Sequence, residues 1–210
     1  MFKVKEIFYS LQGEGINTGR AAVFCRFAGC NLWSGIERDR SASICKICDT
    51  DFVGYTNYTE DKLAEEILNT WKGNQLPFIV FTGGEPTLQL TNSLMNAIYS
   101  KVGKKSSCNF SLETNGTNNF NYLNPIWITV SPKTRDFAMR KGGELKLLFP
   151  LENLSPSYID GLDDLDFKYK YLQPIHNDNY ANNLKSAIAY CLENSSWKLS
   201  LQQHKQIGII

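Results

Sequence analysis

Three cysteines in one polar stretch of the sequence are placed to bind a metal centre. Cys30, Cys45 and Cys48 form the pattern C-x14-C-x2-C, and Cys25 precedes them. Two kinds of centre are compatible with these thiols. All four could bind one zinc ion, with spacings of C-x4-C and C-x2-C. Alternatively, the last three could hold a 4Fe–4S cluster and leave one iron open.

Strand geometry favours the centre with three cysteines. A strand is expected over 21–28, and its alternation places Cys25 on the apolar face, whereas Cys30 lies beyond the strand end. We therefore interpret Cys25 as a packing residue. Cys108 and Cys191 receive the same interpretation, because free cysteine is among the most buried residue types.

A second motif, Thr82-Gly83-Gly84-Glu85-Pro86, directly follows an apolar run at 78–81. Paired glycines let a ligand approach the backbone closely, although this motif alone is also typical of a tight turn between a strand and a helix. Further polar residues follow other expected strands. They are Gln12, Glu113, Ser131, Gln173 and His204.

The elements that must position these residues alternate between strands and helices. Strands are expected at 4–11, 21–28, 78–81, 109–113, 126–130, 145–149, 167–172 and 197–202. Helices are expected from the Thr59 cap to Gly73, around 94–102, and over 151–160 and 180–192. This alternation indicates an α/β fold with a parallel sheet. We expect about six β/α units, which is too few for a closed barrel of eight and predicts a partial, open one. The polar residues should then meet at the carboxyl ends of the strands.

Length and composition limit the class of protein. The 210 residues predict a single domain over 1–210, with an irregular cluster-binding loop at 29–58. The 22 basic and 21 acidic residues argue against a nucleic-acid partner. No long apolar run predicts a membrane span, and no export signal opens the chain. We therefore expect a cytoplasmic protein whose clustered cysteines stay reduced.

The combined motifs resemble the 7-carboxy-7-deazaguanine synthase family of the radical S-adenosylmethionine (SAM) superfamily. The resemblance runs from residue 6 to the C-terminus. Its motifs are Tyr9 to Gly15, Phe24 to Trp33, Cys45 to Phe52, Thr82 to Pro86, Glu113 to Gly116, Val130 to Lys133, Gln173-Pro174 and His204-Lys205. It implies a radical SAM lyase that converts 6-carboxy-5,6,7,8-tetrahydropterin to 7-carboxy-7-deazaguanine and ammonia, for queuosine and related 7-deazapurines. It also implies that a radical formed from SAM takes hydrogen from the substrate, so no side chain is assigned as catalytic.

The resemblance assigns residues to four groups. Cys30, Cys45 and Cys48 would hold the 4Fe–4S cluster, and the Thr50 hydroxyl would contact Mg²⁺. The substrate would meet Leu11, Gln12, Gly13, Arg26, Thr82, His204 and Ile210. SAM would meet Ile47, Asp49, Gly84, Glu85, Glu113, Ser131, Pro132, Lys133, Gln173, Pro174, Ile175 and His176.

Several alternatives stay open at this point. Arg26 could instead form an internal ion pair with Glu6 or Glu113, and His204 could be structural. The chain departs from the family at Ile47, where an aromatic residue is usual, and at Ile210, where proline often ends the chain. The family also implies a homodimer and an electron donor such as flavodoxin or ferredoxin. Rival interpretations are another radical SAM enzyme, such as a glycyl-radical activase, or a zinc-binding module without catalysis.

Overall fold

The computed structural model describes residues 1–102, 109–119 and 121–209, and it has the α/β architecture with a mainly parallel, open sheet that the sequence predicts. The chain divides into two compact units. The first comprises 1–11, 20–114 and 120–127, and the second comprises 12–19, 115–119 and 128–210. The expected single domain stays a prediction. Cys108 and Ile210 lie outside the described residues.

The first unit contains five strands in the order β3-β1-β2-β4-β5. They are β1 (Phe2–Leu11), β2 (Ala21–Phe27), β3 (Thr56–Tyr58), β4 (Phe78–Gly83) and β5 (Asn109–Thr114). β1 runs antiparallel to β2 and β3, whereas β2, β4 and β5 are parallel. The carboxyl ends of these three parallel strands therefore lie at the same edge.

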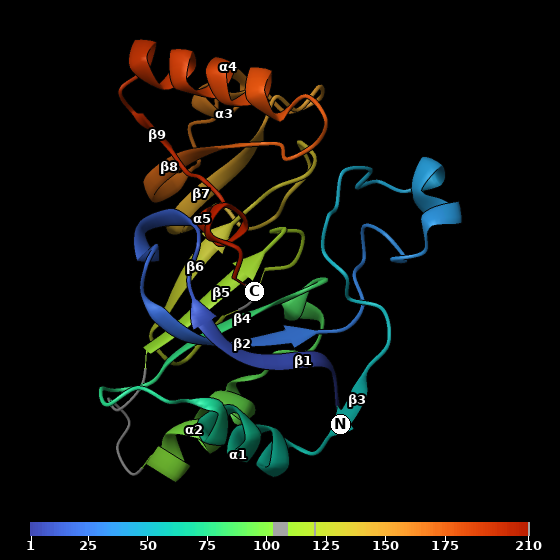
Figure 1. The fold of residues 1–210 in the computed structure, drawn as a ribbon, viewed down its shortest axis with the longest axis vertical. Helices are drawn as coiled ribbons and strands as arrows, with labels where there is room; N and C mark the ends of the chain where they lie inside the picture. The colour runs from blue at the N-terminus through green and yellow to red at the C-terminus, as the bar shows by residue number, and fades with distance from the viewer. Residues whose placement is uncertain (103–108, 120, 210) are drawn as a thin grey trace. The chain divides into compact units, whose positions relative to one another are not determined.

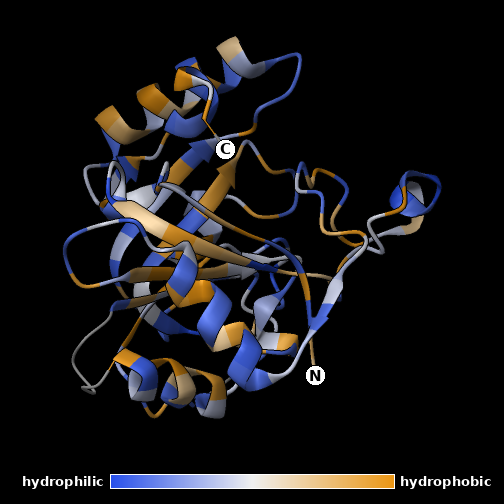
Figure 2. Ribbon diagram, turned by 60° about the horizontal axis from the view of Figure 1, so that its bottom comes forward, coloured by the Kyte–Doolittle hydropathy of each residue, from blue (hydrophilic) through white to orange (hydrophobic). Residues whose placement is uncertain are grey.

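Two helices cover one face of this sheet, α1 (Glu60–Thr70) and α2 (Asn92–Val102) (Figure 1). The Thr59 side chain caps α1 by accepting a hydrogen bond from the backbone N–H of Lys62. The covered face is apolar: Phe81 stacks against Phe27, and Phe110 meets Tyr99 of α2 edge-on. Figure 2 shows the hydrophobic and hydrophilic stripes along the helices that this arrangement requires.

The second unit contains the last three residues of β6 (Ile126–Val130) with β7 (Lys141–Phe149), β8 (Asp166–Pro174) and β9 (Trp197–Leu199), each parallel to the next. Its helices are α3 (Pro156–Asp160), α4 (Tyr180–Glu193) and α5 (Gln203–Ile207). Its core consists of buried apolar side chains that include Trp197. The indole N–H of Trp197 donates to Asp160. No helix among the described residues is long and apolar enough to cross a membrane.

Several element boundaries differ from the sequence expectation. β7 begins at Lys141, because its glycine-rich start pairs with β8 despite a low strand propensity. The helix expected over 151–160 begins at Pro156, where Ser155 supplies the N-cap. The last strand ends at Leu199 and not at 202, and the short elements β3 and α5 were not expected. Short 3-10 helices occur at Gly15–Asn17 (η1), Glu37–Ala42 (η2) and Pro86–Leu88 (η3).

Candidate functional site

The three predicted cluster ligands come together within the first unit. Cys45 is buried beside Leu32, Trp33 and Phe52, and the half-buried Cys30, Ile47 and Cys48 pack against this group. A hydrogen bond with Cys45, together with burial, raises the pKa of the Cys48 thiol. Burial also raises the pKa of the Cys30 thiol, and the charges of Glu85 and Cys48 raise it further. The neutral form is therefore favoured for Cys30 and Cys48, and a bound cationic centre must displace their protons.

The donor set suits a cluster better than a single zinc ion. Cys25 is fully buried on the face of β2 that the helices cover, and burial raises its pKa. It is a packing residue, as predicted, and Cys191 is half-buried against the core of the second unit. Three soft thiols in one loop fit a cluster, because each thiolate can bind a different iron.

The Gly83-Gly84-Glu85 segment forms backbone hydrogen bonds with the residues that precede Cys30. The N–H of Gly84 donates to the Phe27 carbonyl at 3.1 Å, and the N–H of Glu85 donates to the Gly29 carbonyl at 2.9 Å. A Cβ on Gly84 would lie 2.0 Å from the Gly29 oxygen. The glycine at position 84 is thus explained by the contact of two backbone segments, while its predicted approach to SAM stays a prediction.

The Glu85 carboxylate is fully buried and held in one orientation. Its Oε1 accepts hydrogen bonds from the Thr87 N–H at 3.0 Å, the Thr87 hydroxyl at 2.5 Å and the Thr114 hydroxyl at 2.7 Å. These three hydrogen bonds orient the carboxylate. A group fixed in this way is suited to bind a cationic ligand group.

A row of polar side chains crosses the sheet face opposite α1 and α2. Arg26 lies opposite Glu6 on one side and Thr82 on the other. Arg26 Nε contacts Glu6 Oε1 at 2.7 Å, and the Thr82 hydroxyl donates to Glu113 Oε2 at 3.0 Å. Thr82 lies within β4, which extends past the strand expected at 78–81, and Glu113 lies near the end of β5. The internal ion pair to Glu6 is therefore present, and it engages one of the five guanidinium donors.

The Gln12–Gly15 turn of the second unit is organised by the carboxylate of Glu14. This carboxylate contacts the buried ammonium of Lys146 and accepts hydrogen bonds from the amides of Gln173 at 3.1 Å and Gln202 at 2.9 Å. Gln12 accepts from the Glu14 N–H, and the Ser200 hydroxyl accepts from the next N–H along the turn. Burial alone would raise the pKa of Glu14, but Lys146 and the hydrogen bonds lower it to about 2.

His204 also lies against this turn. A Cβ on Gly13 would lie 2.3 Å from His204 Nδ1, and the N–H of Gln203 donates to the Gly13 carbonyl at 3.0 Å. His204 is carried by α5 and is not part of a strand end. The positive charge that His204 can carry helps to lower the pKa of Glu14. Gln12, Gly13 and His204, all predicted to bind substrate, are thus neighbours.

The residues predicted for SAM in the second unit lie in two segments. After β6, the Lys133 ammonium folds back onto Ser131, with 2.6 Å to its carbonyl and 2.8 Å to its hydroxyl. At the end of β8, Gln173 is buried against Glu14, and the ring of His176 lies 4.7 Å from that of Tyr180. Gln173 and Pro174 are the last residues of the strand, with Ile175 directly after it.

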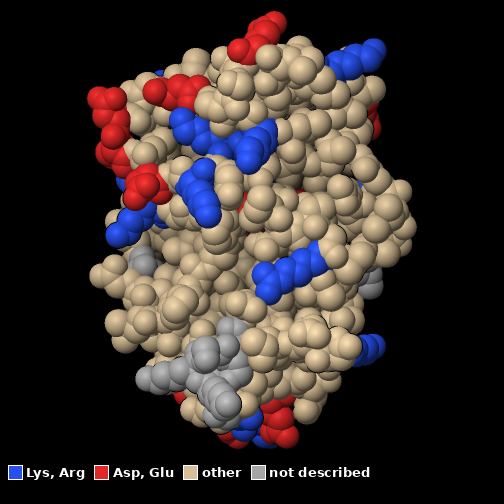
Figure 3. All heavy atoms as spheres, turned by 90° about the vertical axis from the view of Figure 1, so that its left-hand side faces the viewer, with Lys and Arg blue, Asp and Glu red and all other residues tan. Residues whose placement is uncertain are grey.

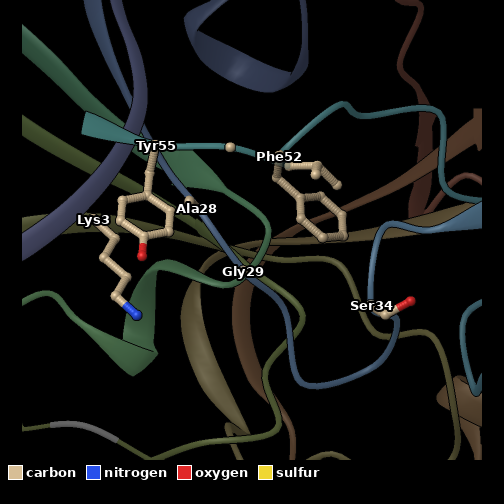
Figure 4. A pocket seen from close by; sticks show the side chains of 8 residues that line it. Lys3, Ala28, Gly29, Ser34, Phe52 and Tyr55 are labelled. Atoms are coloured by element: carbon tan, nitrogen blue, oxygen red, sulfur yellow. The ribbon is translucent and has the colours of Figure 1, made fainter. Parts of the chain in front are cut away.

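The remaining predicted residues are partly exposed. Leu11 is exposed at the end of β1, and Asp49 is exposed on the cysteine loop. Thr50 approaches Cys48 Sγ through its carbonyl oxygen, at 4.0 Å, and not through the hydroxyl predicted to meet Mg²⁺. A pocket of 240 Å³ lies behind this loop, lined by Lys3, Gly29, Phe52 and Tyr55 among others (Figure 4). It contains none of the predicted site residues.

Sequence reasoning missed three residues that organise these groups. Lys146 interrupts the apolar run 145–149, and a lysine inside a buried strand was the available signal. Glu14 stands inside a quoted motif, but its partners are separated from it by more than a hundred residues. Arg40, which contacts the cysteine loop, had no signal in the sequence.

Comparison with known proteins decides the family. The chain is 43% identical to the 7-carboxy-7-deazaguanine synthase of Bordetella pertussis, covering 99% of each chain. It is 44% identical to that of Bradyrhizobium diazoefficiens, also over 99% of each chain. The chain belongs to the 7-carboxy-7-deazaguanine synthase family. No family model matches the sequence.

A solved structure supports the same fold. QueE from Escherichia coli matches with a TM-score of 0.69 at 21% identity, over 95% of this chain and 93% of that one. The 7-carboxy-7-deazaguanine synthase family predicted from the sequence motifs is confirmed by the curated relatives, and the open α/β fold by the solved structure. The residue assignments within the family are predictions.

We expect Gly84→Ala to displace the Cys30 segment, because its Cβ would overlap the Gly29 carbonyl. The cost should be about 1–3 kcal/mol of unfolding free energy, with reduced iron uptake. Gly54→Ala is the control: Gly54 has φ of +77°, but a Cβ there would meet no atom within 4 Å, so it tests backbone strain alone. Urea unfolding and iron content measure both variants. Equal iron loss in the two would contradict the overlap.

The lowered pKa of Glu14 predicts a pH-dependent loss of stability. Because the folded pKa is about 2 and the unfolded value 4.5, the stabilisation is present above about pH 4.5 and disappears toward pH 2. Glu14→Gln should cost about 3 kcal/mol at pH 7, since it leaves Lys146 buried without its countercharge. Urea unfolding from pH 3 to 7 should show this difference shrinking in acid. Glu152→Gln, at an exposed carboxylate, should show none.

Proposed function

We propose that the chain carries out its family's reaction through the residues that the structure gathers at the carboxyl edge of β2, β4 and β5 and around the Glu14 turn. The reaction converts 6-carboxy-5,6,7,8-tetrahydropterin to 7-carboxy-7-deazaguanine and ammonia, as a radical SAM lyase of 7-deazapurine biosynthesis. One observation carries the proposal most directly. Three thiols lie in one loop, and the first of them, Cys30, directly follows the segment whose carbonyls accept hydrogen bonds from the N–H groups of Gly84 and Glu85.

The cofactors of this reaction are a 4Fe–4S cluster, SAM and Mg²⁺. When bound, the reduced cluster and SAM supply the radical chemistry that begins the ring contraction. Cys30, Cys45 and Cys48 would hold the cluster as thiolates, after losing the protons that burial favours. The apolar side chains around Cys45 would keep water from the sulfurs. The Thr50 hydroxyl stays our proposed contact for Mg²⁺.

The SAM contacts divide between charged and apolar groups. The Glu85 carboxylate, oriented by hydrogen bonds from Thr87 and Thr114, would accept a hydrogen bond from the amino group of SAM, and Ile47 would pack against its adenine. Ser131 and Lys133 are suited to its carboxylate and ribose. The further contacts proposed are Asp49, Gly84, Glu113, Pro132, Gln173, Pro174, Ile175 and His176.

Hydrogen-bonding groups are the proposed contacts of the substrate. Arg26 is the proposed partner of its carboxylate, because four guanidinium donors remain beyond the one that meets Glu6. Thr82 lies beside Arg26 in the adjacent strand. Gln12, Gly13 and His204 are neighbours that can meet the ring, with Leu11 and Ile210 as further contacts.

The substrate is therefore a small molecule, and the protein partners are proposals. An electron donor such as flavodoxin or ferredoxin must supply the electron, and we infer a homodimer from the family. On the face drawn in Figure 3, basic and acidic side chains are interspersed, which gives no support to a nucleic-acid partner. A cytoplasmic location is inferred from the need to keep the cysteines reduced.

Anaerobic incubation with SAM, dithionite, Mg²⁺ and 6-carboxytetrahydropterin tests the proposal. Mass spectrometry should detect 7-carboxy-7-deazaguanine, and the reconstituted protein should be brown. Cys30→Ala, Cys45→Ala and Cys48→Ala should each lose iron and product. Cys25→Ala is the matched control and should retain its iron. Iron retained in Cys30→Ala but lost in Cys25→Ala would contradict the ligand set.

Arg26→Lys should weaken substrate binding by about tenfold, with SAM binding nearly unchanged. Lysine keeps the charge but lacks the planar fork that meets a carboxylate through two hydrogen bonds. Glu6→Gln is the control, because it removes only the internal partner of Arg26. Binding of both ligands is measured by titration calorimetry. Equal losses of affinity for pterin and SAM in Arg26→Lys would show that the residue only stabilises the fold.

A further inference from the structure

The insert between Cys30 and Cys45 carries a guanidinium that contacts the second half of the cysteine motif. Arg40 lies in the short 3-10 helix η2. Its Nη1 donates to the carbonyl of Lys46 at 3.2 Å and to the carbonyl of Cys48 at 3.1 Å. One side chain of the insert therefore spans the backbone around the last cysteine.

The other sides of the same guanidinium are also engaged. Its Nε and Nη2 contact the carboxylate of Glu37 at 2.8 Å, and its carbon lies 3.9 Å from the ring centre of Trp33. Trp33 is buried and meets Phe52 edge-on, in the group that includes Cys45. Arg40 thus joins the insert, the aromatic packing and the backbone at Cys48.

The backbone near Cys45 is attached at the opposite end of this segment. The N–H groups of Ile44 and Cys45 both donate to the Leu32 carbonyl, and the Ser43 hydroxyl donates to the Cys45 carbonyl at 2.9 Å. The hydrogen bonds of Arg40 instead hold the backbone carbonyls of Lys46 and Cys48, at the other end of the segment. Without them, the Cys48 end of the segment would keep the contacts of its sulfur, which are the hydrogen bond with Cys45 and the weaker contact with the Thr50 carbonyl at 4.0 Å.

We propose that Arg40 is a positioning residue of the iron–sulfur site, which holds Cys48 in place and sets a fixed positive charge beside the thiolates. The proposal rests on the ligand set given above. A guanidinium is required because two carbonyls, a carboxylate and an aromatic ring are contacted at once, which an ammonium cannot do. The charge favours the reduced, more negative form of a bound cluster.

Arg40→Lys tests the positioning, because it keeps the charge and loses the fork. In the metal-free protein under anaerobic conditions, we expect Cys48 to be alkylated by iodoacetamide about tenfold faster than in the wild type, as peptide mass spectrometry would show. Arg38→Lys is the matched control: Arg38 belongs to the same short helix, but its side chain is 82% exposed and pairs only with Asp39 among the described residues. Cys25 must stay unreactive in every variant, which verifies that each is folded.

Arg40→Gln tests the charge. After reconstitution, the reduction potential of its cluster should move to more negative values, while those of Arg40→Lys and Arg38→Gln stay near the wild type. A purely structural role would not separate the glutamine and lysine variants in this way. An alkylation rate unchanged in Arg40→Lys, or a potential unchanged in Arg40→Gln, would overturn the proposal. A wild-type protein that binds no iron would instead refute the ligand set itself.

Discussion

The contact between the backbone of Gly84 and that of Gly29 is the constraint on which the first unit's site depends. It places the end of β4 against the segment that leads from β2 into the cysteine loop, with hydrogen bonds on both sides of the contact. Any side chain at position 84 would separate the two segments. Because Glu85 and Cys30 each follow this contact by one residue, their positions are coupled. A carboxylate and a thiol that lie far apart in the sequence are thus placed by backbone geometry, which varies less than side-chain geometry.

The second unit fixes its polar residues in a different way, through a buried charge pair. Glu14 and Lys146 are both largely removed from water, and such a pair is stable only when its remaining hydrogen-bonding capacity is satisfied. Gln173 and Gln202 satisfy it from two further elements. The pair thereby joins the turn, β7, β8 and the approach to α5. The attraction between the two charges and the hydrogen bonds to Glu14 offset the desolvation cost of the pair.

Features set by residues close together in the sequence were predictable, whereas features set by distant residues were not. The burial of Cys25 follows from the alternation of side chains within one strand. The Thr59 cap follows from a hydrogen bond between residues three positions apart, so both features were predictable. The paired glycines at 83 and 84 were recognised as a position where something approaches the backbone closely. What approaches Gly84 is the backbone at Gly29, and no local sequence pattern indicates this. The role of Arg40 was missed for a similar reason. Its carbonyl partners leave no trace in the sequence, because every residue has a carbonyl group.

The pairing of Arg26 with Glu6 is compatible with a role in binding a substrate carboxylate. The side chain of Glu6 is 41% exposed, and ion pairs with an exposed partner contribute about 0–1 kcal/mol. Glu6 can therefore exchange this contact for water at little cost, whereas Arg26, at 20% exposure, keeps its place on the sheet face. The pair holds the guanidinium against Glu6 of β1, which lies on the opposite side of β2 from Thr82. An ion pair of this kind is thus a means of orienting a binding group in advance, and its presence does not compete with that function.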